Sequence, residues 1–120
     1  MKIYNELESL GFFEWLSETH NLKDTDMKPE YLDELPLDDI HRTVCNSMAL
    51  RWFREKYGIC SWIDRLYTDD HVLYYRYTCE KSIESPPNYN KTWITLKEYN
   101  TYEEAELACL NKLIEIIKKK

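Results

Sequence analysis

The chain has 120 residues and a formal net charge of −6 at pH 7, and 43% of its residues are hydrophobic and 32% charged. This length suits a single domain with one core, and the composition is that of a folded protein rather than a disordered segment. Overall acidity disfavours a general binder of the nucleic-acid backbone, and a total of two glycines excludes a glycine-rich phosphate-binding loop.

Residues 1–36 are predicted to form an acidic, helical N-terminal extension. Ile3, Leu7, Leu10 and Phe13 recur at helical spacing, which predicts one helix with a break near Gly11. Residues 21–36 are polar, acidic and interrupted by two prolines, so we expect an irregular connection there, with room for a turn of helix. The chain through Asp39 holds eleven acids and three lysines, a charge of −8. We therefore consider that, in the free protein, this segment masks a basic face of the sheet predicted below, and that it leaves this face when a partner arrives.

A second helix is predicted from Leu37 to Tyr57. Asp38 and Asp39 suit its first turn, and Gly58 is placed to cap its C-terminal end. Its predicted buried stripe contains Leu37, Ile40, Val44, Met48, Trp52 and Phe53.

After Gly58 the apolar period changes from about 3.6 to 2. The stretches 59–67, 71–81 and 91–99 are rich in β-branched and aromatic residues and are predicted to be three strands. Thr101 and Glu104 then form a capping box that starts a final helix. The predicted fold is α+β, a single domain of residues 1–120. Its core, residues 37–120, comprises a helix, a three-stranded antiparallel sheet and a C-terminal helix packed on one face of the sheet.

The sequence offers one run that resembles a reactive cluster, Asp69, Asp70 and His71. It falls between the first two predicted strands, where aspartates favour turns because their side chains bond to their own backbone. No further ligand approaches this run at a fixed spacing. We interpret it as a turn.

Other groupings of metal-binding or nucleophilic residues receive the same interpretation. Asp38, His41 and Cys45 share a helix face but are typical of a first-turn acid, a half-exposed histidine and a core thiol. The four cysteines lack a C-x-x-C pair and are expected to be reduced core thiols. We assign no catalytic residue, metal ligand or cofactor site from the sequence.

Alternation along the strands divides their residues between two faces of the sheet. Leu73, Tyr75, Tyr77 and Cys79 are expected to face the helices, as are Ile94 and Leu96. In the stretch 59–67 the pattern is ambiguous; we favour an arrangement with Cys60, Trp62 and Leu66 inward and Ser61, Ile63 and Arg65 outward. The opposite face would then carry aromatic residues among cations, a combination suited to base stacking or to a protein interface. This candidate binding face contains Arg65, Tyr74, Arg76, Trp93 and Lys97. The alternative is a solvated sheet face on which cross-strand aromatic pairs only support the strands.

The order helix, three strands, helix from Leu37 onward is similar to that of double-stranded RNA-binding domains, and the segment TYEEAELACLNKLIEII resembles their last helix. The resemblance implies the fold of about two thirds of the chain. That family contacts phosphates through lysines at the start of its last helix, where this chain has Tyr102, Glu103, Glu104 and Glu106. The resemblance therefore implies the topology without that RNA contact.

Two further motifs resemble small uncharacterised proteins of bacteriophages and gut Bacteroidetes genomes. They are W-[FL]-R-E-K, at Trp52–Lys56, and T-Y-E-E-A-x-x-A-C-L-x-K-L-I-E, at Thr101–Glu115. This resemblance implies an accessory protein of a phage or mobile element.

We expect a non-enzymatic binding or interaction module in the cytoplasm, with a protein partner or a second copy of the chain as its target. No apolar run reaches the ~18 residues that a transmembrane helix needs, so no membrane partner is expected. A nucleic-acid binder acting through the candidate binding face is the alternative. An enzyme whose site the sequence does not reveal is the third hypothesis.

Overall fold

The computed structural model describes residues 3–20, 29–82, 90–95 and 97–119. In chain order the elements are α1 (Ile3–Ser9), α2 (Phe12–His20), α3 (Pro29–Glu34), α4 (Ile40–Tyr57), β1 (Ile59–Tyr67), β2 (Leu73–Ser82), β3 (Asn90–Ile94) and α5 (Tyr102–Lys118). The strands form one antiparallel sheet in the order β1-β2-β3. The predicted α+β fold is confirmed.

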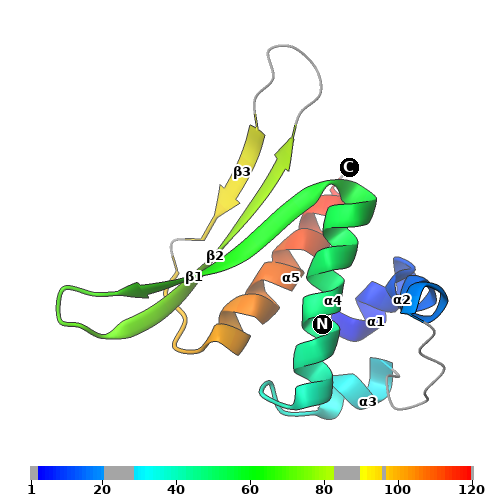
Figure 1. Cartoon of the computed structure of the whole chain (residues 1–120), viewed down its shortest axis with the longest axis horizontal. Helices are drawn as coiled ribbons and strands as arrows, with labels where there is room; N and C mark the ends of the chain where they lie inside the picture. The colour runs from blue at the N-terminus through cyan, green and yellow to red at the C-terminus, as the bar shows by residue number, and fades with distance from the viewer. Residues whose placement is uncertain (1–2, 21–28, 83–89, 96, 120) are drawn as a thin grey trace.

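The molecule consists of three layers, which Figure 1 shows side by side. The sheet packs against α4 and α5, and α1, α2 and α3 lie on the far side of those two helices. The N-terminal helices therefore do not lie over the other face of the sheet. The prediction that the described part of the acidic N-terminal segment masks that face is wrong.

The N-terminal helices are part of the same hydrophobic core as the rest of the chain. Gly11, with a φ of 98°, separates α1 from α2 at the predicted break, because a left-handed residue ends the first helix. The turn lets both helices bury apolar side chains beside Trp52 of α4 and Leu113 of α5. The buried side chains from the N-terminal segment are Ile3, Tyr4, Leu7, Phe12, Leu16 and Leu32.

Helix α4 ends at the predicted Gly58 cap, but it begins at Ile40 instead of Leu37, with Asp39 as its N-cap, and it buries a different face. The Asp39 side chain accepts a hydrogen bond from the His41 amide at 2.9 Å, and Gly58, in the left-handed conformation, donates to the Arg54 carbonyl. Ile40 is 71% exposed and Val44 is also exposed, so the predicted buried stripe is wrong in its first half. The buried residues are Arg42, Cys45, Asn46, Ala49, Trp52 and Phe53.

Two buried polar residues explain the shift of the α4 stripe. Arg42 donates to the Leu35 carbonyl at 2.8 Å, and its guanidinium lies 5.3 Å from the Tyr4 ring centroid. The Tyr4 hydroxyl in turn donates to the Asn46 side chain at 2.5 Å. These contacts give the Tyr4 hydroxyl and one Arg42 nitrogen buried partners, although Arg42 Nε has none among the described residues, and they direct Arg42 and Asn46 of α4 toward α1 and α3 while Ile40 and Val44 remain exposed.

The strand register decides which face of the sheet meets the helices. Cys79 of β2 lies opposite Ser61 of β1 and Trp93 of β3, and paired residues point to the same face. Cys79 is fully buried, and its Sγ lies 3.7 Å from Sγ of Cys109 on α5. The helix-side face therefore carries Ile59, Ser61, Ile63, Cys79, Tyr77 and Trp93.

The predicted orientation is confirmed for β2 and wrong for β1 and β3. Trp62 and Ile94, predicted to point inward, are exposed on the face opposite the helices. Ile63 and Trp93, predicted to point outward, pack against the core. Leu96 was also predicted to be inward but lies outside the described residues.

The corrected faces predict losses of stability of different size for two tryptophans. Replacing Trp93 by alanine should lower the free energy of unfolding by about 2–3 kcal/mol, because it removes packing against the core. Replacing Trp62 by alanine should cost less than about 1 kcal/mol, because that side chain is 43% exposed and lies on the face opposite the helices. Urea unfolding of both variants measures the difference, and a larger loss for Trp62→Ala would contradict the assigned faces.

Candidate functional site

The sheet face that points away from the helices, here called the open face, is the principal candidate site. Three residues form one row across it, with Trp62 and Ile94 on either side of Thr78. Trp62 is 43% exposed and Ile94 58% exposed, whereas Thr78 between them is only 5% exposed. By register and alternation, the open face comprises Cys60, Trp62, Asp64, Leu66, Tyr74, Arg76, Thr78, Glu80, Thr92 and Ile94.

Charges of both signs lie beside this apolar row. Arg76 and Glu80 occupy β2 two residues before and two residues after Thr78, and Asp64 lies directly opposite Arg76 on β1. The Arg76 guanidinium lies 5.8 Å from the centroid of the Tyr74 ring. The open face thus holds one base and two acids, which gives it no positive field of its own.

The structure divides the predicted candidate binding face among three places. Tyr74 and Arg76 lie on the open face as predicted. Arg65, opposite Tyr75, and Trp93, opposite Cys79, lie on the helix side, so their predicted orientation is wrong. Lys97 follows β3, and its Nζ lies 5.2 Å from the centroid of the Tyr99 ring.

A tyrosine cluster on the helix side of the sheet is a feature that sequence reasoning missed. Tyr75 pairs with Arg65 on one side and with Tyr99 on the other, and its ring makes an edge contact with Tyr102 at 6.1 Å. Arg65 donates to the Tyr67 hydroxyl at 3.0 Å. Alternation places Tyr75 and Tyr77 on one face of β2. The sequence could have placed Tyr67 of β1 on the same face only if the register of the hairpin had been known.

The Asp69–His71 run is a turn, as predicted. The Thr68 amide donates to the Val72 carbonyl at 2.9 Å, and the Val72 amide donates to the Thr68 hydroxyl at 3.1 Å. His71 has a φ of 63°, an uncommon conformation for a residue other than glycine, and is exposed. It closes the turn instead of starting β2.

The other predicted reactive groups do not converge. Cys45 is buried, whereas Asp38 and His41 are exposed in solvent. Within the described part of the chain, no group of three His, Cys, Asp or Glu residues is arranged to hold a metal ion. Cys45, Cys79 and Cys109 are buried thiols as expected, but Cys60 is exposed on the open face, which corrects the prediction for that residue.

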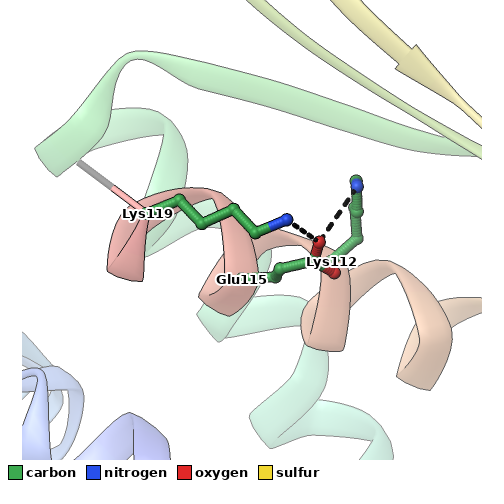
Figure 2. A network of polar contacts seen from close by, with 3 residues as sticks. All are labelled: Lys112, Glu115 and Lys119. Carbon is green, nitrogen blue, oxygen red and sulfur yellow. Dashed lines mark hydrogen bonds and ion pairs between the residues drawn. The ribbon is translucent and has the colours of Figure 1, made fainter.

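The lysines at the end of α5 take part in ion pairs within the molecule. Figure 2 shows Glu115 between Lys112, at 3.5 Å, and Lys119, at 2.8 Å. The hydrogen bond from Lys119, followed by the charge of Lys112, lowers the pKa of Glu115. Lys118 pairs with Glu6 and so links α5 to α1. These contacts give the described C-terminal lysines a structural role.

A buried carboxyl group lies at the contact between α4 and α5. Glu106 is 1% exposed, and neither of its oxygens has a hydrogen-bond partner of normal geometry. Burial raises its pKa from 4.5 to about 7; nearby Asn46 and Tyr102 oppose the shift, and the charge of Glu103 adds to it. Sequence reasoning missed this residue because Glu103, Glu104 and Glu106 together are typical of a solvated first turn.

Comparisons with protein-family models, curated proteins and solved structures found no match to this chain. Among the helices described, none combines the length and the apolar character needed to cross a bilayer.

The raised pKa of Glu106 predicts that the free energy of unfolding falls as pH rises. Because its folded pKa of about 7 exceeds the ordinary 4.5, its contribution is fully present below pH 4.5 and is lost as pH rises through 7. Glu106→Gln should therefore match the wild type near pH 4.5 and exceed it by up to about 3 kcal/mol at pH 8. Urea unfolding across this range measures the difference, with Glu104→Gln as the control. A pH-independent difference would contradict the assignment.

Proposed function

We propose that this chain is a non-enzymatic interaction module that binds a protein partner on its open face. The observation that carries the proposal is the exposed row of Trp62 and Ile94 around Thr78, on a face that lies opposite the packed helices. A half-exposed tryptophan beside an exposed isoleucine gives the centre of this face the character of an interface core. Arg76, Asp64 and Glu80 supply polar groups beside it.

The charge of the open face favours a protein over a nucleic acid. A nucleic-acid strand needs a groove in which cations outnumber acids and in which aromatic rings are free to stack. Here Arg76 is accompanied by Asp64 and Glu80, and Arg65 lies on the other face. A protein partner can match a mixed set of charges residue by residue.

The location of the carboxyl group with the raised pKa also favours a binding function over a catalytic one. The carboxyl group whose pKa is raised most, that of Glu106, is buried between helices, where a substrate does not reach it. We further propose that the protein acts in the cytoplasm as an accessory protein of a phage or mobile element. This last step is supported by the two sequence motifs at Trp52–Lys56 and Thr101–Glu115.

Photo-cross-linking from the open face tests the proposal. Trp62 is replaced by benzoylphenylalanine, and the protein is irradiated in an extract of the cells that naturally produce it. The matched control carries the same residue in place of Ser47, which is exposed on α4 and distant from the open face by sequence and packing. Position 62 should give discrete protein adducts that position 47 does not.

Two outcomes would overturn the proposal. Equal adducts from both positions, or none from position 62, would show that the open face has no specific protein partner. A position-62 adduct that nuclease digestion removes would instead establish the nucleic-acid alternative.

A further inference from the structure

We propose that the open face binds a second copy of this chain, face to face. The two-fold axis would lie between the two facing sheets and run parallel to the row formed by Trp62, Thr78 and Ile94. This inference deepens the proposed function and rests on it, because it names the partner of the same surface. The argument comes from the arrangement of charges about that row.

A two-fold interface places one patch against an identical patch, so the patch must complement itself. Residues on the axis face their own counterparts, and this favours apolar side chains there and excludes charged ones. The central row meets this condition, since Trp62 would lie against Trp62 of the second copy and Ile94 against Ile94. Contacts between aromatic rings and between aliphatic groups are favourable, because they add dispersion attraction and remove apolar surface from water.

The charged residues of β2 are arranged symmetrically about the same row. Arg76 precedes Thr78 by two residues and Glu80 follows it by two, and all three side chains point to the open face. A rotation about the Thr78 row exchanges the two positions. Arg76 of each copy would then face Glu80 of the other, which gives two opposite-charge pairs in one interface.

The two rows that carry charged residues fail this test, and only the Thr78 row exchanges Arg76 with Glu80. An axis along the row of Asp64 and Arg76 would bring each of these residues against its own kind. An axis along the row of Cys60, Glu80 and Thr92 would place Glu80 against Glu80. Like charges in direct contact oppose association, so the charge pattern selects the Thr78 row.

The size of the face predicts a weak dimer. A nine-residue strand at ~3.3 Å per residue is about 30 Å long, and three strands ~4.8 Å apart span about 10–15 Å. The resulting footprint of about 300–450 Å² is roughly half of the ~800 Å² that each partner buries in a standard interface. An interface of this size belongs to the class of weak, transient complexes, so the dimer should dissociate on dilution.

Sedimentation equilibrium over ~5–500 μM tests this arrangement by charge reversal. Arg76→Glu and Glu80→Arg should each weaken dimerisation at least tenfold, because each variant places like charges in both pairs. A one-to-one mixture of the two variants should recover the wild-type affinity, since every pair then joins opposite charges. The matched control is Arg65→Glu, the same change on the helix side of the sheet, and it should leave the affinity unchanged.

A second pair of variants tests the same axis at an exposed position, where a substitution should not destabilise the sheet. Ile94 is largely in solvent, so Ile94→Lys and Ile94→Asp should fold. Each should lose dimerisation, because position 94 faces itself across the axis, and their mixture should recover it. Circular dichroism confirms that each variant is folded.

Three results would overturn the inference. A wild-type protein that is monomeric at every concentration has no second copy on its open face. A dimer that charge reversal leaves intact uses another surface. Variants whose mixtures fail to recover affinity place the axis elsewhere. None of these results bears on foreign adducts from position 62, so the proposed function is judged separately by its own experiment.

Discussion

The contact between Cys79 on β2 and Cys109 on α5 fixes which face of the sheet is buried. Strand residues alternate between faces, so one buried position assigns every other residue of the paired strands. Cys79 is fully buried and pairs with Ser61 and Trp93. Ile63 and Tyr77, two residues along their strands, therefore lie on the helix side as well. The same constraint places Trp62, Thr78 and Ile94 on the open face, and the proposed function depends on that placement.

The sequence predicted the elements well because local signals mark their ends. The strand β1 was predicted at its observed bounds, and Gly58 and Thr101 cap their helices as expected, whereas α4 begins at Ile40 instead of the predicted Leu37. The faces of β1 and β3 were not predictable from composition. Trp62 and Ile63 are adjacent and both apolar, as are Trp93 and Ile94, so alternation gave no contrast. In β2, Arg76 and Thr78 against Tyr77 and Cys79 supplied that contrast.

The candidate site was predicted only in part for the same reason. Tyr74 and Arg76 belong to the strand whose faces were identified, whereas Arg65 and Trp93 belong to strands whose faces were reversed. Glu106 could not have been identified, because its burial results from the packing of α5 against α4 and α1 rather than from its local sequence. The pairing of Asn46 with Tyr4 likewise joins residues 42 positions apart.

The central claim is that Trp62 lies on an open face and Trp93 on the packed one, and acrylamide quenching of tryptophan fluorescence tests it most directly. Trp52 is buried and Trp15 half-buried, so Trp62 should supply most of the readily quenched signal. Trp62→Phe should therefore lose that component, while Trp93→Phe should retain it. The reverse result, with accessible fluorescence lost only in Trp93→Phe, would show that the two faces are inverted and would remove the basis of the proposed interface.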